Sequence, residues 1–109
     1  MSNDTKLGKI QSCRHGFGGY QDAMFGYTFT LGGDGWGVGD FWGTWADRPD
    51  YSKWTDKDQA DIFAANAARV RDLLKAAKVS SFSNLEGVPV EIQFEDMRLK
   101  SWRILTEVL

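Results

Sequence analysis

The chain has 109 residues, and thirteen lysines and arginines stand against fifteen aspartates and glutamates, for a net charge of −2 and a pI near 5.3. This acidic balance excludes a protein that tracks long nucleic acid, because release of counterions from phosphates requires a basic surface. The 42% hydrophobic content excludes a disordered chain and favours a single domain over residues 1–109.

The compartment is inferred from the cysteine count and from the N-terminus. Cys13 is the one cysteine, so no internal disulfide can form, which fits a reducing cytoplasm. The first ten residues lack the apolar run of a signal peptide, and no stretch approaches the length of a transmembrane helix. We therefore expect a cytoplasmic protein without membrane contact, whose residues 1–5 form a loose terminus.

The first half of the chain predicts three strands. Residues 6–13 form a weak strand pattern, and the glycine-rich residues 14–20 favour a loop. Strict alternation over residues 23–31, rich in aromatics and threonine, predicts a half-buried strand. Residues 32–35, GGDG, suit a tight hairpin turn, and residues 36–45 are the return strand.

The return strand carries its glycines in register. Each glycine weakens a strand by roughly 0.5–1 kcal/mol relative to alanine, so several on one side need a reason. Either the protein's own backbone or a large side chain lies against that side, or a ligand does, and the sequence leaves both explanations open. One side presents Gly35, Gly37, Gly39 and Gly43, and the other presents Trp36, Val38, Asp40, Trp42 and Thr44.

A helix is predicted in the second half. Residues 46–54 favour a loop, and Thr55 is the expected N-cap of a helix that runs to about Lys78. The acidic first turn and the lysines near the end complement the helix dipole. The predicted apolar stripe consists of Ile62, Phe63, Ala67, Val70, Leu73, Leu74 and Ala77.

Two strands follow the predicted helix. Residues 80–87 form a connector, residues 88–95 alternate as a strand that Pro89 would start at a sheet edge, and residues 99–109 form a long final strand. The resulting order β-β-β-α-β-β predicts an α+β fold with one long helix on an antiparallel sheet. An open edge in so small a sheet favours a homo-oligomer, paired through that edge or through the helix face.

No catalytic set, metal site or cofactor is predicted. His15 is the only histidine and has no second histidine or cysteine pair for zinc. The run GDGWGVGD lacks the following helix of a dinucleotide fingerprint and the repeats of a calcium-binding array. Paired carboxylates would have to converge from residues that spacing alone does not bring together. These acidic residues are Asp22, Asp34, Asp40 and Asp47.

Aromatic and basic residues nevertheless offer the parts of a nucleotide site. Bases stack on aromatic faces for roughly 1–3 kcal/mol each, and a guanidinium grips phosphate oxygens at two points. Asp40 is the best single candidate for a polar contact. The competing interpretation is that most of the tryptophans form the core. The candidate ligand-binding residues are Arg14, His15, Phe17, Tyr20, Trp36, Asp40, Trp42, Trp45, Lys100 and Arg103.

Three segments carry a family resemblance. GGYQDAMFGYTFTL, GWGVGDFWGTW and the terminal LKSWRILTEVL resemble small uncharacterised proteins encoded by tailed phages and prophages of proteobacteria, over nearly all of the chain. The resemblance implies a viral accessory protein and, by looser analogy, a sponge that sequesters a nucleotide immune signal, as inhibitors of Thoeris and CBASS defence do.

Three hypotheses follow for the cytoplasm of an infected bacterium. The first is an anti-defence protein that binds a cyclic or ADP-ribose-type nucleotide without cleaving it, between protomers. The second is a protein-interaction module that docks on a host or phage protein through exposed aromatics. The third is a hydrolase of a small nucleotide. The absence of a convincing catalytic set favours binding.

Overall fold

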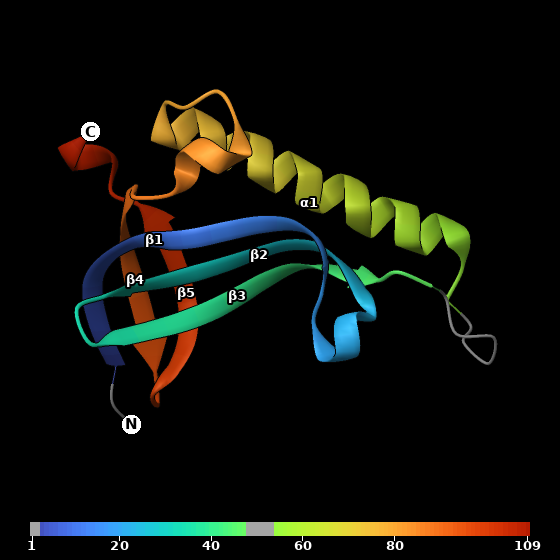
Figure 1. Ribbon diagram of the computed structural model, residues 1–109, viewed down its shortest axis with the longest axis horizontal. Helices are drawn as coiled ribbons and strands as arrows, with labels where there is room; N and C mark the ends of the chain where they lie inside the picture. Colours follow the sequence, from blue (N-terminus) through green and yellow to red (C-terminus); the bar gives the residue numbers. More distant parts are fainter. Residues whose placement is uncertain (1–2, 48–53) are drawn as a thin grey trace.

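The computed structural model describes residues 3–47 and 54–109, so the segment 48–53 within the predicted loop lies outside the described part. Five antiparallel strands form one sheet in the spatial order β3-β2-β1-β4-β5, with one long helix, α1 (Figure 1). The predicted α+β class is thereby confirmed. The order of elements along the chain differs in detail from the predicted β-β-β-α-β-β, because three short 3₁₀ helices lie between or after the strands. The elements are β1 (Asn3–Gly18), η1 (Tyr20–Asp22), β2 (Met24–Gly33), β3 (Trp36–Trp45), α1 (Asp56–Ala77), η2 (Phe82–Leu85), β4 (Pro89–Glu95), β5 (Arg98–Ile104) and η3 (Thr106–Val108).

Strand β1 is the long element that joins the two halves of the sheet. Its first part pairs with β4 and its second part pairs with β2, and Lys9 belongs to both ladders. A register shift after Ile10 and the bend of the strand let β4 and β5 cross the helix side of β2 and β3 (Figure 1).

The long β1 corrects two predictions. Residues 3–5 are not loose, because they pair with residues 93–95 of β4. Residues 14–18 are not a loop, because they pair with residues 24–28 of β2. The glycines that suggested a loop are tolerated because the neighbouring strand supplies the hydrogen bonds.

The hairpin of β2 and β3 agrees with its prediction. The bounds of β3 are as expected, and β2 continues to Gly33, so the turn is reduced to Asp34 and Gly35. Gly35 has φ +78°, in the left-handed region that glycine adopts without steric cost. The hairpin therefore follows directly from local sequence.

Local signals also fix both ends of α1. The Thr55 side chain accepts a hydrogen bond from the Asp58 backbone N–H, and the Asp58 carboxylate accepts one from the Thr55 N–H, which completes a capping box. Lys78 closes the helix in a left-handed conformation. The buried stripe differs in one position: Asn66 is buried and Ala67 is exposed. Asn66 precedes Val70 by four residues and so shares its side of the helix.

The last third of the chain corrects two further predictions. Pro89 begins β4, but β4 lies between β1 and β5 and is not an edge; proline is accepted because it is the first strand residue. The final strand ends at Ile104 and not at Leu109, since the ladder closes with the bond from Leu105 N–H to Pro89 O and η3 follows.

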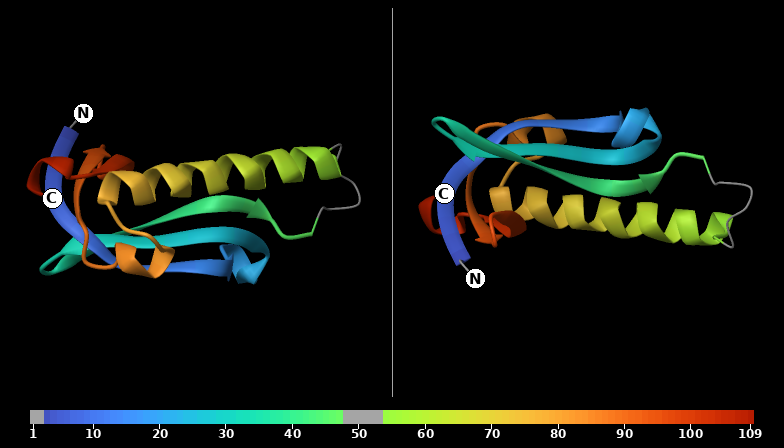
Figure 2. Two further views of the ribbon diagram at one scale, coloured as in Figure 1. Left: turned by 90° about the horizontal axis from the view of Figure 1, so that it is seen from above. Right: turned by 90° about the horizontal axis from the view of Figure 1, so that it is seen from below.

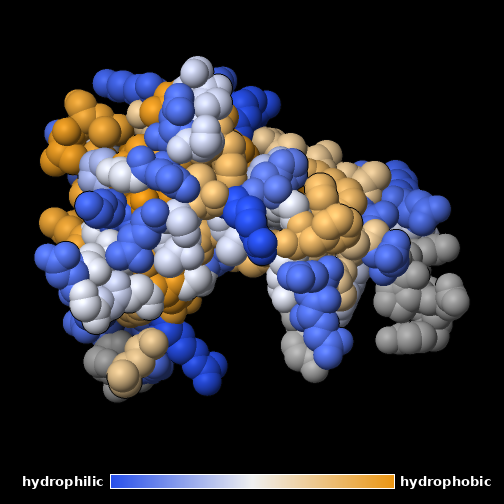
Figure 3. All heavy atoms as spheres, in the orientation of Figure 1, coloured by the Kyte–Doolittle hydropathy of each residue, from blue (hydrophilic) through white to orange (hydrophobic). Residues whose placement is uncertain are grey.

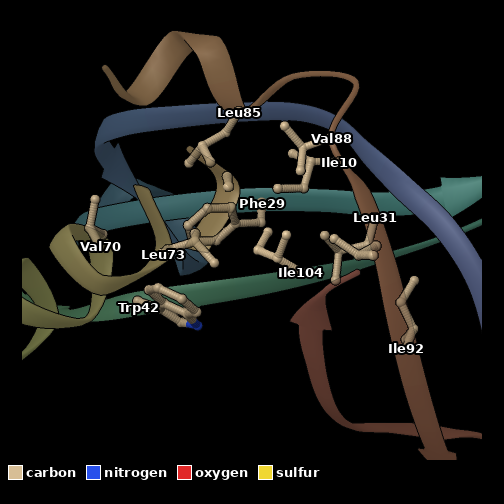
Figure 4. Close-up of a cluster of buried hydrophobic side chains, with 12 residues drawn as sticks. Ile10, Phe29, Leu31, Trp42, Val70, Leu73, Leu85, Val88, Ile92 and Ile104 are labelled. Atoms are coloured by element: carbon tan, nitrogen blue, oxygen red, sulfur yellow. The ribbon is translucent and has the colours of Figure 1, made fainter. Parts of the chain in front are cut away.

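The core lies between the sheet and α1, which runs along one face of the sheet (Figure 2). Phe29 of β2 is fully buried at its centre, between residues of the helix and of β5 (Figure 4). Complete burial of such a side chain stabilises the fold by roughly 1.5–3 kcal/mol. The core residues are Ile10, Phe29, Leu31, Trp42, Val70, Leu73, Ala77, Leu85, Val88, Val90, Ile92 and Ile104.

Candidate functional site

Asp40 of β3 is the polar centre of the helix side of the sheet. Its Oδ2 accepts hydrogen bonds from the indole N–H of Trp42 at 2.9 Å and of Trp102 at 2.7 Å. Its Oδ1 accepts one from the Phe41 backbone N–H at 3.0 Å. Three donors therefore hold the carboxylate, and Trp102 reaches it from β5, 62 residues away in the chain.

Aromatic rings and one cation surround this carboxylate. The indoles of Trp42 and Trp102 stack with centroids 5.5 Å apart, and the ring of Phe29 lies 4.6 Å from the first and 5.1 Å from the second. The guanidinium carbon of Arg69, from α1, lies 3.9 Å from the centroid of Trp42. Because the ring face carries partial negative charge, it attracts this cation.

A cavity of about 290 Å³ opens beside the Asp40 cluster, between β3, β5 and α1. Two cations line it, Arg69 and Lys100, against the single negative charge of Asp40. Arg69 has no ion pair with any residue of the described ranges, and Lys100 Nζ lies 3.9 Å from Glu95. The lining residues are Asp40, Phe41, Trp42, Arg69, Leu99, Lys100, Ser101 and Trp102.

Three of the predicted site residues meet in this cavity, namely Asp40, Trp42 and Lys100. Sequence reasoning missed Trp102 and Arg69. Trp102 carried a signal, as an aromatic in the alternating final strand, but nothing local tied it to Asp40. Arg69 lies outside the predicted apolar stripe of the helix, and only its position over Trp42 distinguishes it from the other helix cations.

Arg103 is paired with two carboxylates and does not line the cavity. Its guanidinium donates to Glu107 at 2.7 and 2.8 Å and to Glu91 at 3.2 Å. These hydrogen bonds raise the pKa of Arg103 and lower the pKa of Glu107 to about 2. Arg103 is therefore held by two carboxylates outside the cavity lining, and its contact with a phosphate stays a prediction.

Trp36 and Arg14 also lie outside the cavity. Trp36 packs against Phe94, and Lys6 Nζ lies 5.0 Å from its ring centroid. Arg14 alternates with Cys13 and His15 on β1, so it points to the face opposite α1, where its guanidinium lies beside Gly18. From sequence we expect Trp36 and Arg14 to lie in one site with the other candidate residues. The strand register instead places them away from the cavity.

His15 and Phe17 do not line the cavity, and Phe82 connects their ring contacts to Phe29. His15 stacks on Tyr27 with centroids 4.2 Å apart, and Phe17 meets Phe25 edge to face at 5.3 Å. His15 is therefore a strand residue and not the loop residue that was predicted. Trp45 is 43% exposed at the end of β3, outside the cavity lining, and the side chain of Tyr20 lies outside the described part of the structure.

The Cys13 side chain contributes to packing and hydrogen bonding and is not exposed as a reactive thiol. Its Sγ donates to the backbone oxygen of Phe82 at 3.3 Å. Burial, with a smaller contribution from the negative charge of Glu86, raises the pKa of the Cys13 thiol. A raised pKa depletes the thiolate that a nucleophile requires.

Packing explains Gly43 but not the other two glycines of β3. An alanine Cβ at Gly43 would collide with the Phe25 carbonyl and would lie 2.9 Å from the Phe41 ring, so close strand approach requires glycine there. Gly37 and Gly39 differ: both are exposed, and at Gly39 an added Cβ would meet nothing closer than 3.8 Å. The ligand explanation therefore does not apply at Gly43, and the indoles lie on the other face.

This arrangement describes a small cavity with aromatic walls, two cations and a hydrogen-bonded carboxylate. Within residues 3–47 and 54–109, no three potential metal ligands cluster together and no helix is long and apolar enough to cross a membrane. No protein-family model, curated protein or solved structure matches the chain.

Proposed function

We propose that this protein binds a small nucleotide without cleaving it, in the cavity beside Asp40. The observation that carries the proposal is the pairing of two cations, Arg69 and Lys100, with two indoles that Asp40 holds in place. A phosphate binds between the cations, and the base lies against the exposed part of the indole pair. The excess of positive charge in the lining favours an anion.

The dimensions support a ligand of this class. Ligand pockets are usually about 300–1,000 Å³, and a cavity of about 290 Å³ lies at the lower end, which limits the enclosed part of the ligand to one nucleotide unit. Arg69 already lies on the face of Trp42, which is the place where a flat base would stack. A base that enters there replaces the cation–π contact and frees the guanidinium for phosphate oxygens.

The lining supports binding in preference to catalysis. A general base needs a lone pair aimed at the substrate, and three of the roughly four acceptor sites of the Asp40 carboxylate are taken by hydrogen bonds from the protein. The hydroxyl of Ser101 donates to Gln93 at 3.4 Å, and His15 stacks on Tyr27 outside the cavity lining. A bound nucleotide would therefore be released chemically intact.

The kind of nucleotide is proposed from the resemblance to small phage-encoded proteins. A cyclic or ADP-ribose-type immune signal, made by a bacterium during infection, is the ligand that a non-catalytic sponge would sequester. One nucleotide unit would occupy the cavity, and the remainder would extend over the rim formed by Leu99 and Lys100.

Titration calorimetry against a panel of cyclic dinucleotides and ADP-ribose derivatives tests the proposal. We expect binding of at least one member, weakened tenfold or more by Arg69→Ala and unchanged by Arg71→Ala, whose side chain pairs with Asp72 on the same helix. Chromatography should recover the nucleotide intact. Silence across the panel, or equal binding by the Arg69→Ala variant, would contradict the proposal.

A protein-interaction module is the second candidate, favoured by exposed apolar side chains. In the space-filling view the hydrophobic residues form several groups on the surface, separated by hydrophilic ones (Figure 3). A stoichiometric partner from host lysate that is lost with Phe17→Ala would favour this function. The exposed residues are Leu7, Phe17, Trp45, Met97, Val108 and Leu109.

A further inference from the structure

The backbone groups on the free edge of β3 can be assigned from one hydrogen bond. Ala46 N–H donates to Ala23 O at 2.9 Å, and hydrogen-bonded pairs alternate along an antiparallel ladder. The residues between those pairs direct their N–H and C=O away from β2. They are Gly37, Gly39, Phe41, Gly43 and Trp45.

Two side chains already occupy part of this edge. The Asp40 carboxylate accepts from the outward N–H of Phe41, and the Gln59 side chain donates to the outward carbonyl of Trp45 at 2.7 Å. Gly37 and Gly39 have no such partner in the described part of the chain. The free segment of the edge is therefore short and lies next to the hairpin turn (Figure 1).

This segment lacks the features that keep sheet edges from pairing. Natural edges are protected by lysine, proline or bulges, and β5 follows this rule with Arg98, Lys100 and Arg103. Residues 35–39 contain no charge and no proline. Gly37 and Gly39 are exposed, so another strand can reach their outward N–H and C=O groups at strand distance.

We propose that two copies of this chain pair through residues 37–39 of β3, antiparallel about a two-fold axis at Val38. Gly37 of each copy exchanges two hydrogen bonds with Gly39 of the other, so four new bonds form. The two sheets become one continuous sheet. An isologous contact of this kind needs one segment that is complementary to itself, which Gly-Val-Gly provides.

Charge selects this register over its neighbours. An axis at Asp40 would set two carboxylates opposite each other and would require the Phe41 N–H that Asp40 already holds. With the axis at Val38, Asp40 of one copy stands opposite Trp36 of the other. Lys6 lies over that indole and brings a positive charge towards the carboxylate. The second copy therefore fits this edge in charge as well as in hydrogen bonding.

The contact also places Trp36 of one copy beside the Asp40 cavity of the other. This consequence does not depend on the proposed ligand, because the pairing rests on backbone groups. It agrees with the expectation of a homo-oligomer and specifies which edge forms it.

Light scattering over a range of concentrations tests the dimer. We expect a molar mass of twice the 12.3 kDa of one chain, and a single-chain mass for Gly39→Pro. Proline removes the outward N–H and is tolerated on an edge strand whose N–H faces solvent. Gly39→Ala is the matched control, because its Cβ meets nothing closer than 3.8 Å and its N–H remains, so it should stay dimeric.

Amide hydrogen exchange of the unmodified protein keeps the proposal testable if Gly39→Pro fails to fold. The amides of Gly37 and Gly39 should exchange slowly at high protein concentration and rapidly on dilution, while the amide of Phe41 should not depend on concentration. A single-chain mass at every concentration would overturn the proposal. So would a dimer that persists in folded Gly39→Pro, or rapid exchange at Gly37 and Gly39 in the dimer.

Discussion

The indole N–H of Trp102 donates to Oδ2 of Asp40 at 2.7 Å, and this bond joins β5 to β3, the two strands at opposite ends of the sheet order. The bend of β1 makes the contact possible, because it carries β4 and β5 across the helix side of the hairpin. The same contact forms the wall of the proposed nucleotide site, so the stability of the fold and the shape of the cavity depend on one carboxylate.

Replacement of Asp40 should therefore destabilise the protein. Asp40→Ala leaves the part-buried N–H groups of Trp42 and Trp102 without their acceptor, and a hydrogen bond to a charged group contributes about 1.5–3 kcal/mol. We expect urea unfolding to show a loss of about 2–4 kcal/mol. Asp72→Ala, which removes an exposed carboxylate, should change the free energy of unfolding by less than about 0.5 kcal/mol.

A double-mutant cycle separates this bond from the other effects of the substitution. Combination of Asp40→Ala with Trp102→Phe should reveal a coupling energy of about 1 kcal/mol or more, since the two groups are in direct contact. Additive effects would show that the hydrogen bond contributes nothing to stability.

The two kinds of glycine on β3 should respond oppositely to alanine. Gly43→Ala forces a Cβ against the Phe25 carbonyl and the Phe41 ring, and such overpacking costs about 1–3 kcal/mol. Gly39→Ala meets no obstacle and should be neutral or stabilise the strand by about 0.5–1 kcal/mol. Thermal unfolding of the two variants provides the comparison, and equal melting temperatures would contradict the packing explanation.

Arg103 should control the titration of Glu107. Its hydrogen bonds hold the pKa of Glu107 at about 2, below the ordinary value of 4.5. A lowered carboxyl pKa stabilises the folded state above the unfolded pKa, and this contribution is lost as pH falls from 4.5 towards 2. In Arg103→Ala, NMR titration should find the pKa of Glu107 raised towards its ordinary value.

The matched control for this titration is Lys100→Ala, whose side chain pairs with Glu95 and does not touch Glu107. That variant should leave the pKa of Glu107 unchanged. A pKa that stays near 2 in Arg103→Ala would assign the shift to the backbone of η3, where the Glu107 carboxylate also accepts a hydrogen bond.

The local elements of this protein follow from sequence alone. Thr55 and Asp58, three residues apart, form the capping box that begins α1. The alternating pattern of β3 and the positive φ of Gly35 determine the hairpin. Each of these signals operates between near neighbours in the chain, through capping, side-chain period or permitted φ, so no distant contact is needed to interpret it.

Tertiary structure decided which of the aromatic and basic residues belong together. Asp40 and Trp102 are 62 residues apart, and they meet only because β1 changes its partner from β4 to β2 near Lys9. The sequence does not distinguish Arg103 from Arg69 as a candidate for binding an anion. In the structure, Arg103 forms ion pairs with Glu91 and Glu107, whereas Arg69 lies over the ring of Trp42. Strand pairing and the choice of ion-pair partner depend on residues far apart in the chain. The local sequence pattern therefore does not predict which partner a given strand or side chain will have.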